Sequence, residues 1–212
     1  MYTRFIKRTI DFVISLCAII TLLPLFLVLI VVGTIEMKGN PFFVQRRPGM
    51  IGKDGKEKIF YLIKFRTMTN SKDESGKLLP DSLRLKGYGR LLRSTSLDEL
   101  PELFNILMGD MSIVGPRPLM ERYLLYYTDL ERKRHTVRPG LTGYAQVHGR
   151  NTVSWEDRIN QDLYYVEHLS LLLDIKIVFQ TVALVLRREG TSNDEMENFD
   201  DYRKRQWEME KR

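Results

Sequence analysis

The sequence predicts an α/β fold that is mainly α-helical with a few short strands, in which an apolar membrane segment precedes a compact domain. Three observations predict this architecture. Residues 12–33 carry no charge, apolar side chains recur at helical spacing in several later stretches, and two short runs rich in β-branched and aromatic residues flank a turn rich in Gly and Lys. With 212 residues and 43% hydrophobic composition, the chain is large enough to bury one core of ordinary size.

The overall charge favours an anionic partner. Lys and Arg number 33 against 27 Asp and Glu, a net charge of +6 that suits lipid head groups or nucleotide phosphates. Basic charge alone also suggests nucleic acid, but the apolar segment and the acidic residues between 193 and 201 argue against that partner. The single cysteine, Cys17, excludes an internal disulfide framework. The histidines show no metal-ligand spacing, and the chain has neither a P-loop nor a GxSxG nucleophile elbow.

The apolar segment is long enough to reach across a bilayer. A helix over residues 12–33 measures roughly 33 Å at about 1.5 Å per residue. Pro24 lies in its middle and removes the amide bond to the carbonyl of Ile20, so a break is expected near Pro24. Basic residues flank both ends, which places both ends in the cytoplasm by the positive-inside tendency. A re-entrant hairpin satisfies both flanks, and a proline-kinked spanning helix is an equally good interpretation of the residues alone.

Two strands are expected after the membrane segment, at residues 42–46 and 59–66, joined by a turn around Gly52 and Gly55. The period of two in a strand places Lys64 and Arg66 on the same face, so two cations project together from the end of the second strand. The alternative is a solvated strand edge that carries charges against aggregation.

A polar loop at residues 67–80 and a broken helical pattern at 81–93 lead to a helix that is expected to begin at Ser96 and end at Gly109, its glycine C-cap. Ser96 and Glu99 have the spacing of a capping box, so Asp98 and Glu99 are explained by a helix start alone. The same helix start suits a carboxylate nucleophile. Amides at a helix N-terminus would keep Asp98 ionised and attract a substrate phosphate.

Helices are expected at residues 119–127, 128–135, 155–166 and 169–186, with a short strand at 143–147. The helix at 169–186 is interpreted as a buried core helix in preference to one in the membrane interface. Asp162 falls close to the apolar face of its helix, where an unpaired carboxylate is costly, so it is expected to pair with an arginine or a metal. The charge-rich sequence from Glu189 onward predicts a mobile or marginally helical tail.

Several cations in polar or Gly/Pro-rich surroundings are candidates for neutralising a diphosphate next to Asp98. They are Lys64, Arg66, Arg93, Arg117 and Arg150. Arg117 stands between Pro116 and Pro118, which restrict the backbone that carries its guanidinium.

Seven blocks of sequence, in one order, carry a resemblance to a known family. They are Gln45–Gly49, Lys64–Met68, Arg93–Pro101, Gly109–Ser112, Val114–Pro118, Arg138–Gly143 and Gly149–Asn151. Together with the basic N-terminus and the apolar segment, these blocks resemble the bacterial sugar transferase family, the monotopic phosphoglycosyl transferases, over residues 2–188. The chain is most similar to the compact members of that family.

The resemblance implies an enzyme that moves a sugar 1-phosphate from a UDP-sugar to undecaprenyl phosphate and releases UMP. Asp98 would be the nucleophile that forms an aspartyl-phosphosugar intermediate, and Glu99 would complete a catalytic dyad. The family requires Mg²⁺, which is assigned to Asp98, with Glu99 as a second ligand or as a base. The site residues implied for phosphate and substrate binding are Lys64, Arg66, Arg93, Arg117, Arg150 and Asp162, the last ordering the arginines. The donor would be an N-acetylated UDP-sugar such as UDP-N,N'-diacetylbacillosamine, for the first membrane step of glycoconjugate biosynthesis.

The resemblance also implies where the protein acts. Residues 1–36 would form a re-entrant membrane helix hairpin broken near Pro24, residues 37–188 a compact interfacial catalytic domain with amphipathic helices, and residues 189–212 a charged tail. The chain would be a minimal catalytic unit at the cytoplasmic face of the bacterial inner membrane, with membrane lipid and downstream glycosyltransferases as partners and no nucleic acid. The alternative function is a membrane-anchored binding module without chemistry of its own.

Overall fold

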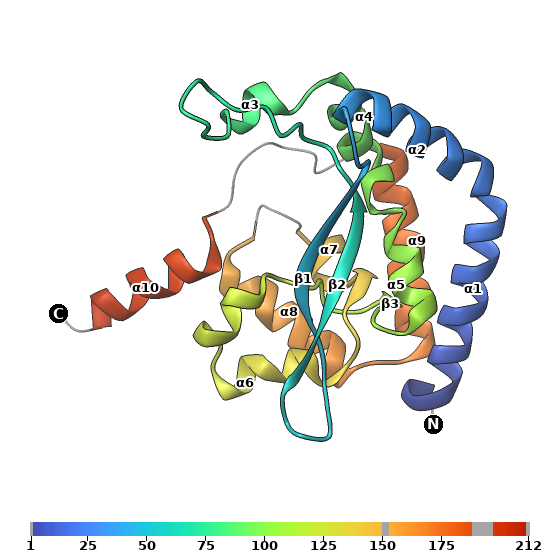
Figure 1. The fold of residues 1–212 in the computed structure, drawn as a ribbon. Coiled ribbons are helices and arrows are strands. Elements are labelled where there is room, and N and C mark those ends of the chain that lie inside the picture. The colour runs from blue at the N-terminus through green and yellow to red at the C-terminus, as the bar shows by residue number, and fades with distance from the viewer. Residues whose placement is uncertain (1, 150–152, 188–196, 211–212) are drawn as a thin grey trace.

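The computed structural model describes residues 2–149, 153–187 and 197–210. In chain order its main elements are α1 (Lys7–Thr21), α2 (Leu23–Met37), β1 (Phe42–Ile51), β2 (Glu57–Phe65), α3 (Asp81–Arg84), α4 (Gly87–Thr95), α5 (Glu102–Met108), β3 (Ser112–Val114), α6 (Asp129–Arg132), β4 (Gly140–Thr142), α7 (Tyr144–Val147), α8 (Trp155–Glu167), α9 (Leu171–Arg187) and α10 (Phe199–Glu210). Short 3₁₀ helices lie at Leu97–Glu99, Glu121–Tyr126 and Lys133–Thr136, and a π-helical turn at Tyr2–Ile6. Figure 1 shows α1 and α2 along one side of the molecule and α10 on the opposite side. The fold is mainly α with a few short strands, as predicted.

The apolar segment forms two helices that meet at a sharp bend. Among the described residues no single helix is long and apolar enough to cross a membrane, but α1 and α2 together are, and they are bent by 64°. The break falls at Leu22. Pro24 lies in the first turn of α2, where the missing N–H of a proline costs no helical hydrogen bond. The chain therefore turns just before Pro24.

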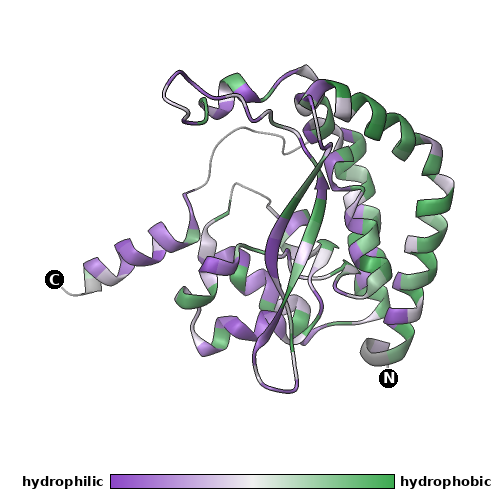
Figure 2. Cartoon of the chain, viewed as in Figure 1, coloured by the Kyte–Doolittle hydropathy of each residue, from purple (hydrophilic) through white to green (hydrophobic). Residues whose placement is uncertain are grey.

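Polar contacts fix one face of α1 to the rest of the molecule. Asp11 accepts hydrogen bonds from the hydroxyl of Ser112 at 2.7 Å and from the amide of Ile113 at 3.0 Å. Lys7 pairs with Asp174 of α9 at 2.6 Å. The other face of α1 and much of α2 remain apolar and exposed, and Figure 2 shows this run of hydrophobic residues along both helices. The bent helices thus combine an anchored polar face with an uncovered apolar one.

The two predicted strands form an antiparallel hairpin, and both are longer at the turn than the sequence predicts. Asn105 of α5 clamps β2: its amide donates to the carbonyl of Tyr61 at 2.8 Å, and its side-chain oxygen accepts from the amide of Ile63 at 3.0 Å. Phe60, Leu62 and Phe65 are buried. The end of β2, with Lys64, is therefore held against the N-terminal end of α5.

The predicted capping box at Ser96 is wrong. Ser96 adopts a left-handed conformation with φ of 56°, in which it ends α4 by donating its amide to the carbonyl of Arg93 at 3.3 Å. Its side chain makes no capping bond, and α5 begins only at Glu102. Asp98 and Glu99 thus lie in a 3₁₀ turn between two helices, outside the first turn of α5. The predicted C-cap is confirmed, because Gly109 has φ of 94°.

Residues 143–147 form helix α7, so the strand predicted there is wrong. The strand lies three residues earlier, where β4 pairs in parallel with β3. The pairing requires a close backbone approach: a Cβ on Gly140 would lie 2.1 Å from the amide nitrogen of Gly115. Because Gly140 has no side chain, the two strands can approach this closely. The helices predicted at 119–127 and 128–135 are short, and the capping box that starts α6 is formed by Thr128 and Glu131.

The interpretation of the helix at 169–186 as a buried core helix is wrong. In α9 only Asp174 and Ile177 are fully buried, whereas Leu172, Phe179 and Leu186 are 79%, 72% and 78% exposed. The apolar residues face outward because the inner side of the helix is occupied by the polar contacts of Asp174 with Lys7 and Tyr165. The helix presents a wide apolar surface.

The tail, expected to be mobile or marginally helical, contains a packed helix, α10. Phe199, at the start of α10, is fully buried among aromatic rings, with its centroid 5.1 Å from that of Tyr127 and 5.2 Å from that of Trp155. The indole of Trp155 donates to the carbonyl of Glu197 at 2.8 Å. Charge dominates this stretch of sequence, but α10 docks through the buried ring of Phe199 and through polar contacts such as those of Tyr202 with Glu156 and Arg203 with Glu131.

Phe199→Ala is expected to lower the free energy of unfolding by about 3 kcal/mol, because it opens a cavity between α10, Tyr127 and Trp155. Denaturant unfolding in detergent measures the change. Trp207→Ala is the matched control, since it removes a larger aromatic from the same helix at a position that is 44% exposed. Equal losses in the two variants would contradict the docking role of Phe199.

Candidate active site

Four charged side chains from three parts of the chain meet at the end of β2. Glu99 accepts hydrogen bonds from Lys64 at 2.8 Å and from Arg117 at 2.7 Å, both at Oε1. Lys64 also lies 3.0 Å from Oε1 of Glu102. The Glu102 side chain is almost fully buried, whereas the side chain of Arg117 keeps 41% of its surface exposed. Arg117 can therefore contact an incoming anion while Glu99 holds its position.

Asp98 lies next to this cluster and differs from its neighbour. It is half-buried, and none of the described residues donates a hydrogen bond to its carboxylate. Burial raises the pKa of Asp98 and the charge of Glu99 adds to the rise, while Lys64, Arg117 and Arg93 oppose it. A carboxylate that is more basic than usual and has no partner among the described residues suits a nucleophile near several cations.

The two glutamates have opposite pKa shifts. Burial alone would raise the pKa of Glu99, but Arg117 and Lys64 lower it to about 2. Burial raises the pKa of Glu102 to about 7, although Lys64 opposes the rise. Glu99 is therefore the ionised partner of both cations at neutral pH, and Glu102 is the group of the cluster that titrates near neutrality.

Glu102→Gln is expected to flatten the pH dependence of stability. A carboxyl whose pKa is higher in the folded state holds its proton more tightly there, so the wild type should lose stability as the pH rises from about 4.5 through about 7. The glutamine variant has no proton to lose in this range. Unfolding free energies measured at several pH values check this. Parallel curves for the two proteins would contradict it.

The remaining predicted cations occupy different surroundings. Arg93 donates from Nε to the hydroxyl of Thr67 at 3.1 Å and lowers the pKa of Asp98, so it belongs to the site. For Arg66 the described contacts include a backbone hydrogen bond to the carbonyl of Pro41, with no ion pair to the cluster. Arg150 lies outside the described residues.

Asp162 has the arginine partner that its sequence position predicts, and that partner is Arg134. Nε and Nη2 of Arg134 donate to one carboxylate oxygen at 3.0 and 2.6 Å, and both side chains are almost fully buried. Nη2 also donates to the backbone carbonyl of Arg117 at 2.8 Å. Asp162 therefore acts on Arg117 through Arg134. Arg134 is not among the site residues predicted from the sequence.

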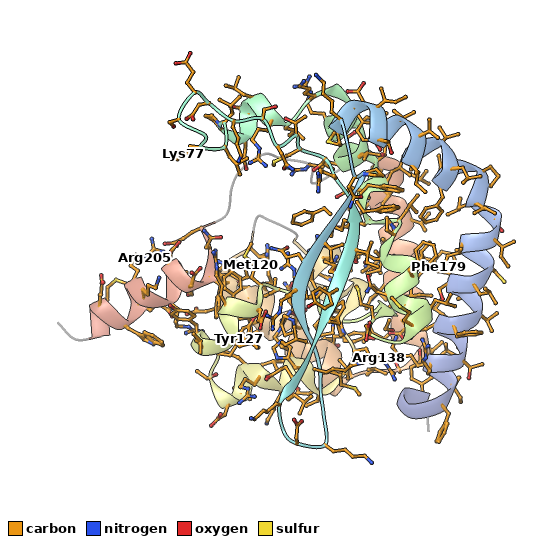
Figure 3. All side chains as sticks on the ribbon, viewed as in Figure 1. Lys77, Met120, Tyr127, Arg138, Phe179 and Arg205 are labelled. Atoms are coloured by element: carbon orange, nitrogen blue, oxygen red, sulfur yellow. The ribbon has the colours of Figure 1, made fainter. Side chains whose placement is uncertain are left out.

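A second set of contacts ties Arg134 to the β-hairpin. Nη1 of Arg134 lies 3.2 Å from Nε2 of His135, whose Nδ1 lies 3.2 Å from Glu57 of β2. Burial and the charge of Arg134 lower the pKa of His135 to about 3, so the ring is neutral. The two contacts fit a ring that accepts at Nε2 and donates from Nδ1. Tyr127, labelled in Figure 3, packs edge-on against this imidazole at 5.4 Å.

A cavity of about 440 Å³ opens beside the cluster. Its charged lining includes Glu99, Arg117 and Arg158, and much of its wall consists of aliphatic residues from α5, β4 and α9. The volume lies within the range of about 300–1,000 Å³ that is common for small-molecule sites. Asp98 is adjacent in sequence to the lining residue Glu99 rather than part of the wall itself.

The site fits a metal ion that is shared with a substrate. Within the described residues no group of three or more His, Cys, Asp and Glu side chains is arranged to hold a metal alone. Mg²⁺ commonly takes one or two carboxylates and completes its shell with water and substrate phosphates. The Asp98 carboxylate, without a partner among the described residues, and Oε2 of Glu99 are donors of this kind, because Lys64 and Arg117 bind Glu99 at Oε1.

Comparison with known proteins identifies the family. The model of the bacterial sugar transferase family matches residues 2–188. The sugar transferase EpsL of Bacillus subtilis is 49% identical over 166 residues, which cover 77% of this chain and 80% of EpsL. The undecaprenyl-phosphate galactose phosphotransferase of Salmonella typhimurium is 38% identical, with 89% of this chain aligned to 42% of that protein.

A third relative, the UDP-N-acetylgalactosamine-undecaprenyl-phosphate N-acetylgalactosaminephosphotransferase of Aeromonas hydrophila, is 37% identical, with 88% of this chain aligned to 45% of that protein. The chain spans less than half the length of these last two relatives. The match to the family model covers nearly all of the described residues, including the whole cluster around Asp98. The chain is therefore a member of the bacterial sugar transferase family.

Proposed function

We propose that the protein transfers a sugar 1-phosphate from a UDP-sugar to undecaprenyl phosphate through a covalent intermediate on Asp98. The observation that carries the proposal is the half-buried Asp98 carboxylate beside the Lys64–Glu99–Arg117 cluster, at the edge of a cavity with charged and aliphatic walls. The names of the relatives from Salmonella and Aeromonas, which act on undecaprenyl phosphate, support the same reaction class.

In the first step a carboxylate oxygen of Asp98 attacks the β-phosphorus of the donor. The bond from that phosphorus to the bridging oxygen breaks, and UMP leaves with the oxygen and its electron pair. Arg117 and Arg93 neutralise the phosphates, because Arg117 is partly exposed and Arg93 lies close enough to lower the pKa of Asp98. Arg150, in a matching family block, is proposed as a further phosphate ligand.

In the second step a phosphate oxygen of the acceptor attacks the phosphorus of the aspartyl phosphosugar. The bond from phosphorus to the Asp98 oxygen breaks, which forms the polyprenyl diphosphosugar and regenerates the carboxylate. Glu99 positions Lys64 and Arg117 during both steps through its contacts at 2.8 and 2.7 Å. A bound Mg²⁺ would supply further neutralisation of the phosphates, with Asp98 and Oε2 of Glu99 as its protein ligands.

The sugar is proposed to be N-acetylated. The galactose-transferring and N-acetylgalactosamine-transferring relatives are 38% and 37% identical to this chain, so overall similarity does not favour one sugar over the other. A UMP-release assay across UDP-galactose, UDP-glucose, UDP-N-acetylgalactosamine and UDP-N,N'-diacetylbacillosamine decides the donor. An N-acetylated donor should give the highest kcat/KM, and preference for UDP-galactose or UDP-glucose would contradict this part of the proposal.

The protein is further proposed to act at the cytoplasmic face of the bacterial inner membrane, with α1 and α2 as a re-entrant hairpin and α9 in the interface. The 64° bend at Leu22, the basic residues on both flanks and the exposed apolar side chains of α9 support this placement. With Cys17 replaced, single cysteines at Thr3 and Lys38 should be labelled from the same side of the membrane. Labelling from opposite sides would indicate a spanning helix.

The function as a whole is tested by mixing the purified protein with a UDP-sugar, Mg²⁺ and undecaprenyl phosphate and measuring UMP. Stoichiometric release of UMP and formation of a lipid-linked sugar are expected. Binding of lipid without release of UMP from any donor of the panel would favour a membrane-anchored binding module instead.

A further inference from the structure

The cavity beside Glu99 joins charged and aliphatic surfaces in one space. Its charged residues are connected to one another: Glu99 binds Arg117, the carbonyl of Arg117 binds Arg134, and Arg134 binds Asp162. They therefore form one continuous charged side. Arg158, which also lines the cavity, packs over the ring of Trp155 at 4.8 Å and adds another cation. This side suits a phosphate group.

Another part of the cavity wall comes from α9. Val178, Val182 and Val185 line the cavity, and their spacing of four and three residues puts them on one face of the helix. The hydroxyls of Thr142 and Thr181, which also line this wall, are 2.7 Å apart and hydrogen-bond each other. The two hydroxyls are therefore hydrogen-bonded within the protein. Contact with a hydrocarbon chain would not leave them without a partner, so the desolvation cost is small.

The described lining contains no Phe, Tyr or Trp. A uracil base is commonly held by stacking on an aromatic ring, and such a ring is lacking here among the described residues. Branched aliphatic side chains instead pack well against a branched hydrocarbon. The composition of the wall therefore favours the lipid substrate over the nucleotide of the donor.

The valines of α9 also lead out of the cavity. Val178, Val182 and Val185 are 37%, 51% and 37% exposed, although they line the cavity, and they adjoin the exposed apolar surface of the same helix. A cavity of about 440 Å³ is far too small for a whole polyprenyl chain. A lipid bound at its phosphate end would therefore extend out of the cavity, past the exposed side chains of these three valines.

We propose that this cavity is the acceptor site: the phosphate of the polyprenyl phosphate lies against Arg117 and Arg158, and its first isoprene units lie against Val178, Val182 and Val185 of α9. The inference rests on the proposed transfer reaction and adds the location of the acceptor. It places the acceptor phosphate next to Glu99, one residue from the phosphosugar on Asp98, where its oxygen can attack.

Val182→Asn tests the proposal, because it puts an amide where hydrocarbon is expected and its half-exposed position tolerates a polar side chain. The KM for undecaprenyl phosphate should rise roughly 10- to 100-fold, the usual cost of disturbing a hydrophobic pocket. Release of UMP from the donor alone, which reports the first step, should be unchanged. The rise in transfer rate along a series of acceptors with one, two, three and more isoprene units should also become shallower.

Leu125→Asn is the control, because it removes an apolar side chain at a position that is 83% exposed and lies outside both the cavity lining and α9. It should leave the acceptor KM within about twofold of wild type under detergent. An unchanged acceptor KM in Val182→Asn would overturn the proposal, as would a rise in the donor KM, which would assign the cavity to the nucleotide. Absence of UMP release in the wild type would instead contradict the proposed function.

Discussion

Asp98→Asn is expected to lower turnover by roughly 10³-fold or more and to eliminate the covalent adduct. The amide keeps the size of the side chain but has no ionised oxygen with which to attack phosphorus. The fold should be unaffected, because the Asp98 carboxylate accepts no hydrogen bond from the described residues. UMP release and intact-protein mass after incubation with donor measure both effects.

Glu99→Gln provides the comparison for that variant. It weakens the hold on Lys64 and Arg117, which bind Oε1 of Glu99, but leaves the nucleophile in place. We expect slower formation of an adduct that still reaches completion. If the Asp98 variant kept an adduct while the Glu99 variant lost it, Glu99 would be the nucleophile instead of Asp98.

Arg134→Met is expected to destabilise the protein by about 3–5 kcal/mol. The substitution keeps an unbranched apolar stem but loses the guanidinium, and so removes the partner of Asp162, whose side chain is 3% exposed. A buried charge without its partner is among the costliest changes that a core can suffer. The donor KM should also rise roughly tenfold, because the carbonyl of Arg117 loses its donor at 2.8 Å. Denaturant unfolding and donor titrations measure the two effects.

The double variant Arg134→Met, Asp162→Leu separates stability from positioning. Replacing both members of a buried ion pair with apolar residues is often neutral or stabilising, so most of the lost stability should return. The donor KM should stay high, since the contact to Arg117 is still missing. Recovery of the KM together with stability would show that Arg134 has only a structural role.

The sequence predicts the members of the cluster better than their local geometry. Lys64, Asp98, Glu99 and Arg117 stand in family blocks, and three of them do meet through direct contacts. The helix start predicted at Ser96 fails because the residue closes α4 in a left-handed conformation instead. A capping box is a local signal, and the packing of α4 against the next turn overrides it.

The missed residues lie where sequence patterns carry little signal. Arg134 stands in the run Arg132–His135, which has the composition of a solvated basic surface. Only the fold shows that Asp162 binds Arg134 and that Glu57 contacts the neighbouring His135. The burial of Glu102 could have been predicted from its spacing, because it lies three residues before Asn105 and four before Ile106, on the buried face of the same helix. A carboxyl on the inner face of a short helix indicates a buried cation, here Lys64.

The exposed apolar face of α9 shows a second limit of local patterns. A run whose only charged residues are Asp174 and Lys176 favours a core helix as an interpretation of the sequence, although a helix at a lipid surface has the same pattern. Asp174 decides the orientation, because it is drawn inward by Lys7, which is far away in the sequence, and by Tyr165, nine residues before it. The orientation of α9 thus depends on the pair Lys7 and Asp174, which are more than 160 positions apart. A local window of sequence cannot contain such a pair.

The formation of a bond between Asp98 and the sugar phosphate is the central claim, and mass spectrometry of the enzyme incubated with UDP-sugar and Mg²⁺ in the absence of lipid tests it directly. We predict that the peptide containing Asp98 gains the mass of one phosphosugar, and that undecaprenyl phosphate then removes it. UMP release that always requires the lipid, with an unmodified peptide at every time point, would contradict the account.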